Sequence, residues 1–237
     1  MNDITLIHTY YNEPDHLRRN LETWYTFDFP IKIMIVDDGS MIHPAYDVLK
    51  DVSLPENVTL SLYRVKDDIG FNSHGARNLA AKVADSEWLL FLDIDHNIHN
   101  WNLKTLVEEA ELKSHVLYKF GGVEFVAIKH IDRRVTVNQF LISKEKFAET
   151  GGYDESYTSV HWGDRPFIEE VVESSSRMVV FKTIILPVYR GGRKIIIDNS
   201  FERPVYDEKR MTIHMPDPYK ITNLTTKRIN FEWERIL

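Results

Sequence analysis

Strand and helix signals alternate along the first hundred residues, and this alternation constrains the fold more than any other feature of the sequence. Two stretches between the strand signals carry one apolar face each, at residues 14–25 and 76–84, and are predicted helices. The short apolar runs that precede, separate and follow them are predicted strands, at 4–8, 31–36, 58–64 and 88–92. Strands that alternate with helices in this way predict a mainly parallel sheet of right-handed βαβ units.

The pattern changes after about residue 115. Residues 123–131 and 135–143 are predicted to form longer, partly antiparallel strands. A short helix with Ser143 as its N-cap should follow over 144–150 and end at the pair Gly151-Gly152. A further helix over 165–175 and a strand over 178–188 complete the prediction, and the sequence from about residue 200 is irregular.

Composition excludes several classes of site and partner. The 237 residues contain no cysteine, which rules out disulfides and thiolate metal sites and suits a reducing cytoplasm. The N-terminal sequence lacks the pattern of a signal peptide, and no apolar run reaches the roughly 18 residues of a membrane span. A formal net charge of −7 argues against a large nucleic-acid footprint, although a local basic groove is compatible with it. We therefore predict a cytoplasmic protein without a membrane span.

Acidic residues follow the predicted strands at the point where each strand ends. Asp37 and Asp38 follow the second strand, and Asp93 and Asp95 follow the fourth. Because ligands of open parallel sheets bind beyond the carboxyl ends of the strands, we expect these acids to converge on one site. In the sequence Asp93-Ile94-Asp95 the two carboxylates lie near one point, and carboxylate oxygens select Mg²⁺ or Mn²⁺, ions that commonly bridge to phosphates.

Four motifs, in this order and spacing, resemble the family 2 glycosyltransferases with the GT-A fold. They are VDDGS at 36–40, GARN at 75–78, FLDID at 91–95 and ETGGYDE at 149–155. The resemblance covers roughly residues 4–170. It implies an α/β fold in which helices flank a mixed, mainly parallel central sheet, and an enzyme that transfers a sugar from a nucleotide-diphosphate donor with inversion.

The resemblance also implies a role for individual residues. Thr9 and Asp38 line the nucleoside pocket, and Arg77 lies near the base or the phosphates. Asp93 lies toward the ribose and also belongs to the metal motif, and Asp95 binds the ion, Mn²⁺ or Mg²⁺.

Asp164 matches the aspartate that serves as catalytic base in this family. Many relatives carry Glu-Asp where this chain has Gly163-Asp164, and a nearby acid such as Asp154 or Glu155 remains an alternative base. The chemistry needs a single carboxylate to accept the proton of the acceptor hydroxyl.

Three residues late in the chain complete the predicted site. GT-A enzymes often take a third metal ligand from a late segment, so we prefer His214 to His96 as that ligand. Arg190 and Arg193 lie in the basic, glycine-containing segment YRGGRK, which can close over the donor diphosphate.

These observations predict an inverting, metal-dependent glycosyltransferase that uses a nucleotide sugar, by preference a UDP-sugar, and an acceptor sugar, glycan or other hydroxyl compound. We expect one GT-A domain over residues 1–237. It would comprise a nucleotide-sugar-binding half at about 1–100, an acceptor-side half at about 101–200 and an irregular C-terminal segment at about 201–237. The alternative is a binding module for a nucleotide sugar or glycan that kept the fold and lost the chemistry.

Overall fold

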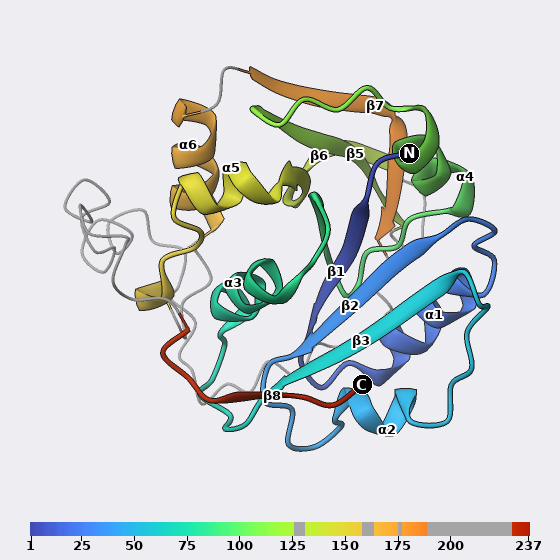
Figure 1. Ribbon diagram of the computed structural model, residues 1–237, viewed down its shortest axis with the longest axis vertical. Helices are drawn as coiled ribbons and strands as arrows, with labels where there is room; N and C mark the ends of the chain where they lie inside the picture. Colours follow the sequence, from blue (N-terminus) through green and yellow to red (C-terminus); the bar gives the residue numbers. More distant parts are fainter. Residues whose placement is uncertain (126–130, 158–163, 175–176, 189–228) are drawn as a thin grey trace.

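A computed structural model of the chain describes residues 1–125, 131–157, 164–174, 177–188 and 229–237. Eight strands within these residues form one sheet in the order β7-β5-β6-β4-β1-β2-β3-β8 (Figure 1). The strands are β1 Ile4–Tyr10, β2 Ile31–Asp37, β3 Val58–Val65, β4 Trp88–Asp93, β5 Val116–Phe125, β6 Ile131–Ser143, β7 Arg177–Val188 and β8 Trp233–Arg235. Strands β1 to β4 are mutually parallel, whereas β6 is antiparallel to both β4 and β5.

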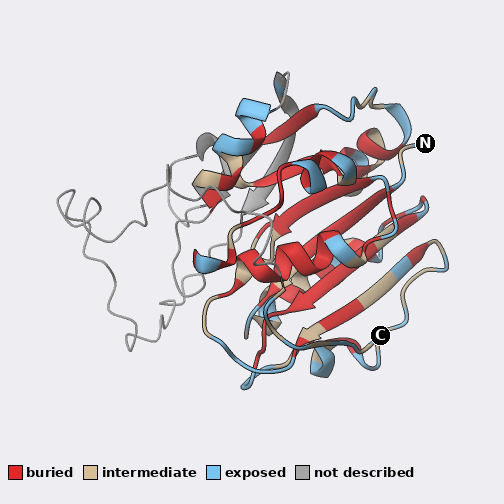
Figure 2. Ribbon diagram, turned by 60° about the vertical axis from the view of Figure 1, so that its left-hand side comes forward, coloured by how far each residue is buried: buried red, intermediate tan, exposed pale blue. Residues whose placement is uncertain are grey.

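Helices cover both faces of the sheet. The helices are α1 Pro14–Trp24, α2 Ala45–Leu49, α3 Ser73–Val83, α4 Asn100–Lys104, α5 Lys144–Glu149 and α6 Asp164–Ser174, with short helical turns at Thr105–Glu109 and Glu155–Tyr157. The apolar residues of α1, α2 and α4 pack on one face, and those of α3, α5 and α6 pack on the other. Figure 2 shows the buried residues concentrated in the strands and in the helix surfaces turned toward them. None of the described helices is long and apolar enough to cross a membrane.

The alternation of side chains along a strand decides which face each acid meets. In β4, Trp88, Leu90 and Leu92 pack on the face of α1. Leu89 and Phe91 pack on the face of α3. Because successive side chains point to opposite faces, Asp93 comes to lie on the side of α3. The carboxylate that ends the strand is therefore directed toward the helix that carries GARN.

The fold class predicted from the sequence is confirmed, with differences at the boundaries of elements. α3 begins at Ser73 rather than at 76, and β5 begins at Val116 rather than at 123. The sequence pattern missed the start of β5 because Val116, Leu117, Tyr118 and Phe120 are all buried, on both faces of the sheet. A run that is buried on both faces has no period-two signal. The predicted irregular segment from about 201 is described only for 229–237, where β8 pairs antiparallel with the edge strand β3.

The turn after α5 depends on two glycines with left-handed backbone angles. Gly151 has φ +85° and Gly152 has φ +74°. A Cβ atom on Gly152 would lie 2.6 Å from Oδ1 of Asn78, the oxygen that accepts a hydrogen bond from the Tyr153 backbone N–H at 2.8 Å. The glycines thus place Tyr153 against α3.

We expect Gly152→Ala to lower the free energy of unfolding by about 2 kcal/mol, from the left-handed backbone and the disturbed Asn78 hydrogen bond. Urea unfolding of this variant beside Ser156→Ala, at an exposed position, measures the effect. Equal stability of the two variants would contradict the strain argument.

Candidate active site

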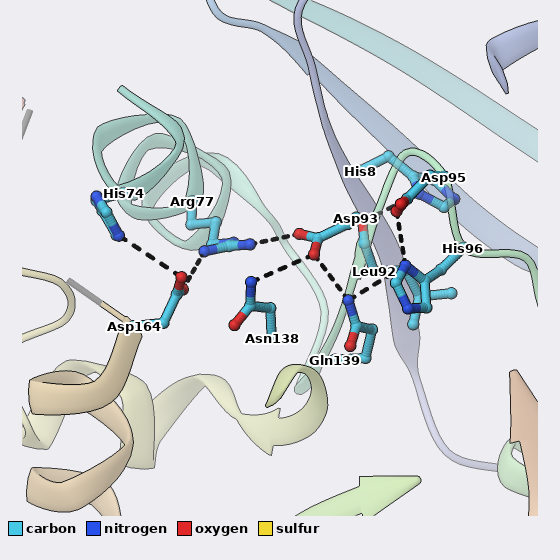
Figure 3. Close-up of polar contacts among 10 residues, drawn as sticks. All are labelled: His8, His74, Arg77, Leu92, Asp93, Asp95, His96, Asn138, Gln139 and Asp164. Atoms are coloured by element: carbon cyan, nitrogen blue, oxygen red, sulfur yellow. Dashed lines mark hydrogen bonds and ion pairs between the residues drawn. The ribbon is translucent and has the colours of Figure 1, made fainter. Parts of the chain in front are cut away.

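Arg77 on α3 joins two of the predicted site carboxylates (Figure 3). Its Nη2 donates to Oδ1 of Asp93 at 2.5 Å, and its Nη1 donates to Oδ1 of Asp164. Arg77 is only 3% exposed, and the two carboxylates more than compensate for the burial of its charge, so the pKa of its guanidinium is raised. The end of β4 and the start of α6 are thereby connected through one side chain.

Asp164 is the first residue of α6 and is held by two residues of α3. Besides Arg77, His74 lies with Nε2 3.8 Å from Oδ2 of Asp164. Residues three apart on a helix share one face, which explains why His74 and Arg77 reach the same carboxylate. Burial raises the pKa of Asp164, but the Arg77 guanidinium and His74 outweigh burial and lower this pKa to about 2. The carboxylate is therefore ionised at neutral pH.

The second oxygen of Asp93 contacts two amides of β6. Gln139 Nε2 donates to Asp93 Oδ2 at 2.8 Å, and Asn138 Nδ2 lies 3.4 Å from the same oxygen. The sequence alone did not identify Asn138, Gln139 or His74 as site residues. The two amides interrupt an otherwise apolar run, VTVNQFLIS, and that interruption was the available signal. Their partner depends on the antiparallel register of β4 and β6, which no local pattern specifies.

Asp93, Asp95 and His96 form a group that can hold a metal ion. One ligand atom from each lies within 4.8 Å of the others. The carboxylate Oδ1 of Asp95 is 2.7 Å from Nδ1 of His96, and both side chains lie just beyond the end of β4. The two carboxylates are ligands that suit Mn²⁺ or Mg²⁺, and the imidazole adds a nitrogen ligand, so the three form a partial ligand set for a divalent ion. The structure places His96 beside the two acids, although His214 was preferred to it from the sequence. His214 lies outside the described residues.

The two aspartates of VDDGS serve opposite faces of the sheet. Asp37 accepts hydrogen bonds from the backbone N–H groups of Ser40 and Ala45, both at 2.8 Å, and so supports the start of α2. Asp38 turns to the other face, where it accepts from the backbone and side-chain nitrogens of Asn72 at 2.9 and 3.0 Å. Burial raises the pKa of Asp38 to about 7, although the Asn72 hydrogen bonds oppose this shift.

Of the three remaining residues predicted to bind the donor, only Thr9 lies within the part of the chain that the structure describes. Thr9 lies near the end of β1, half-buried and in register with Asp93 of β4. It therefore belongs to the same edge of the sheet as the acids. Arg190 and Arg193 lie outside the described residues.

A buried lysine on β5 was also missed by the sequence analysis. Lys119 is 4% exposed, and its Nζ lies 5.4 Å from the centroid of the Phe140 ring. The pKa of Lys119 is lowered to about 8, mainly by burial and also by nearby Arg77, while Asp164 and Asp93 oppose the shift. A lysine among aromatic residues in a strand gives no sequence signal that separates it from a solvent-facing lysine.

The alternative bases considered from the sequence have other partners. The Glu155 carboxylate accepts from Asn78 Nδ2 at 2.9 Å and from the backbone N–H groups of Ile229 and Asn230 at 2.6 and 3.2 Å. Asp154 accepts from the backbone N–H of Ser156 at 2.8 Å. Glu155 thus ties the C-terminal segment 229–237 to α3, which is a structural role.

A comparison with family profiles matches residues 5–159 to "Glycosyl transferase family 2". This chain belongs to that family. The match contains the motifs VDDGS, GARN and FLDID and reaches past ETGGYDE, so the family predicted from the sequence is confirmed. A comparison with curated proteins finds no match.

Similar solved structures include several of TarS from S. aureus. TarS 1–349 in complex with UDP-GlcNAc aligns with a TM-score of 0.63 at 19% identity, over 81% of this chain and 60% of that chain. The complex of the same fragment with UDP gives 0.61 at 18% identity, over 79% and 60%. A longer TarS structure gives 0.62 at 19% identity, over 79% of this chain and 36% of that chain. At these identities the likeness shows the fold, and the chain spans 60% of the TarS 1–349 fragment and 36% of the longer TarS chain.

Proposed function

We propose that this family 2 chain is an inverting, metal-assisted glycosyltransferase that takes its sugar from a UDP-sugar. One observation carries the proposal: Arg77 connects Asp164, the candidate base, to Asp93 of the candidate metal group. Direct sugar transfer needs a base and a group that binds the diphosphate, and here the start of α6 and the end of β4 bring the two candidates to the same arginine. The family assignment supplies the reaction class.

Asp164 acts as the base in this proposal. The acceptor hydroxyl gives its proton to the Asp164 carboxylate while its oxygen forms a bond to the anomeric carbon of the donor sugar. The bond from that carbon to the diphosphate oxygen breaks, and UDP leaves with the electron pair. One displacement at one carbon inverts its configuration, unlike the two displacements of a retaining hydrolase. The low pKa of Asp164 keeps the carboxylate ionised and able to accept the proton, and it also makes Asp164 a weaker base, because general-base catalysis is most efficient at a pKa near the operating pH.

Asp95 and His96 are the residues we assign to the metal ion. Asp93 already accepts from Arg77 on one oxygen and from the amides of Gln139 and Asn138 on the other, so its position is fixed by protein contacts. The Asp93 carboxylate lies close to Asp95 and His96, so it can share the ion with them or contact the ribose. A bound Mn²⁺ or Mg²⁺ supplies neutralisation of the charge that develops on the leaving diphosphate.

The UDP-sugar donor is supported by two of the similar TarS structures, one in complex with UDP-GlcNAc and one with UDP. Thr9 and Asp38 lie near the carboxyl ends of β1 and β2, and ligands of open parallel sheets bind beyond the carboxyl ends of the strands, which supports a nucleotide there. We assign these two residues to the nucleoside, and Arg190 and Arg193 to the diphosphate. His214 remains a second candidate for the metal. The acceptor is a hydroxyl compound, and the cytoplasmic location stays a prediction from composition.

Asp38→Ala is expected to weaken UDP binding at least tenfold, because it removes the carboxylate that we expect to accept from the imide N–H of uracil. A hydrogen bond to a charged group contributes about 1.5–3 kcal/mol. Isothermal titration with UDP measures the change. Asp37→Ala is the matched control: it removes the partner of two buried N–H groups and should lower stability without changing UDP affinity. Unaltered UDP binding by Asp38→Ala would contradict the nucleoside assignment.

The proposed function is tested with a panel of UDP-, GDP- and dTDP-sugars in the presence of Mn²⁺, read as nucleotide release. We expect release from a UDP-sugar, with water or an added sugar as acceptor. Tight UDP binding without release from any donor, with every acceptor tried, would identify a binding module instead. Release from a GDP- or dTDP-sugar alone would overturn the choice of UDP.

A further inference from the structure

Arg77 is immobilised on three sides. Its two terminal nitrogens donate to Asp93 and Asp164, as Figure 3 shows. Its guanidinium carbon lies 5.3 Å from the centroid of the Tyr153 ring, a cation–π contact. Tyr153 is itself fixed, because Asn78 bonds both its backbone N–H and its backbone carbonyl, at 2.8 and 2.9 Å. Arg77 therefore cannot reorient without breaking contacts with three residues.

The contacts of Arg77 span the two parts of the proposed reaction. Asp93 belongs to the strand end that faces the donor, and Asp164 opens the helix that supplies the base. Arginine has a planar fork of donors that can serve two carboxylates at once, whereas the single ammonium of lysine cannot hold both in a fixed geometry. His74, from the same face of α3, approaches the other oxygen of Asp164.

We propose that Arg77 is a positioning residue, which sets the place of the base Asp164 relative to Asp93, rather than a ligand of the donor phosphates. This inference rests on the proposed function. Its physical reason is that both terminal nitrogens are already occupied by carboxylates in a buried setting. A rigid connection between base and donor site matters because a misplacement of about 1 Å in a reacting group can cost about a hundredfold in rate.

The test compares Arg77→Lys with the wild type, with UDP-GlcNAc as donor and UDP release as the readout. A lysine keeps the positive charge between the two carboxylates, which protects the fold from an unpaired buried acid. We expect kcat to fall by about a hundredfold, while the KM for the donor and the Kd for UDP change by less than about twofold. Arg18→Lys is the control, since Arg18 is exposed on α1 and pairs with Asp15 at 3.1 Å. This control should leave kcat, KM and Kd unchanged.

A second arm measures Arg77→Lys in the background of Asp164→Asn. If Arg77 acts through the base, the lysine has little further effect once the base is gone, so the two losses are not additive. Additive losses, or a raised KM with kcat preserved, would overturn the inference and make Arg77 a donor ligand. These outcomes differ from failure of the proposed function, in which the wild type itself releases no nucleotide from any donor. That result would overturn the function and this inference together.

Discussion

Replacing Asp164 by asparagine is expected to reduce sugar transfer by about a thousandfold while UDP-sugar binding stays within about twofold of the wild type. Asparagine keeps the size of the side chain and can still accept one hydrogen bond from Arg77, so the change removes the basic oxygen and one of the two negative charges beside Arg77, of which Asp93 remains. The measurement pairs single-turnover transfer with isothermal titration of the donor. Loss of turnover with intact binding is the pattern of an interaction made only in the transition state.

Asp154→Asn is the matched control for this prediction. Asp154 lies in the same region, was the alternative base considered from the sequence, and accepts a hydrogen bond from the Ser156 backbone. We expect this variant to retain transfer within about twofold. If Asp154→Asn loses transfer while Asp164→Asn keeps it, the base is Asp154 and the assignment of Asp164 is wrong.

Asp95→Ala should remove the dependence of activity on Mn²⁺. We expect the metal-activated rate to fall by roughly two orders of magnitude or more, because the ion contributes several kcal/mol of charge stabilisation. In the wild type, chelation by EDTA should produce a similar loss that Mn²⁺ restores, whereas the variant should respond weakly to either. The measurement is the rate of UDP release as a function of Mn²⁺ concentration.

Asp67→Ala provides the control for the Mn²⁺ titration, since Asp67 is an exposed acid just beyond β3. The same titration on His96→Ala and His214→Ala decides which histidine completes the metal group. We expect the larger loss of Mn²⁺ affinity for His96→Ala, because His96 lies 2.7 Å from Asp95. Full Mn²⁺ activation of Asp95→Ala would refute the metal assignment.

The sequence predicts the parallel half of the fold well because the information there is local. Each strand of 31–36 or 88–92 is a short apolar run, and the acid that follows it marks the edge of the sheet. The alternation of side chains along β4 then places Asp93 on the face of the sheet that α3 covers. These are properties of single segments, and they can be read without knowledge of strand pairing.

The contacts that organise the site depend on pairing between distant segments and could not be predicted in this way. Gln139 reaches Asp93 only because β6 runs antiparallel beside β4. His74 and Arg77 lie three residues apart on one face of α3, but their shared partner Asp164 comes from α6. A position of Arg77 near the donor stays a prediction from the sequence. The structure adds two contacts that a motif does not specify, with the carboxylates of Asp93 and Asp164.

The stereochemistry of the first product tests the central claim most directly. UDP-GlcNAc carries an α-linked sugar, and a single displacement with Asp164 as base predicts that the β anomer forms first. Proton NMR of the anomeric signal, recorded with wild-type protein and Mn²⁺ before mutarotation is complete, distinguishes the two anomers. Initial formation of the β product, absent in Asp164→Asn, is the predicted result. Initial formation of the α product would contradict the single-base mechanism.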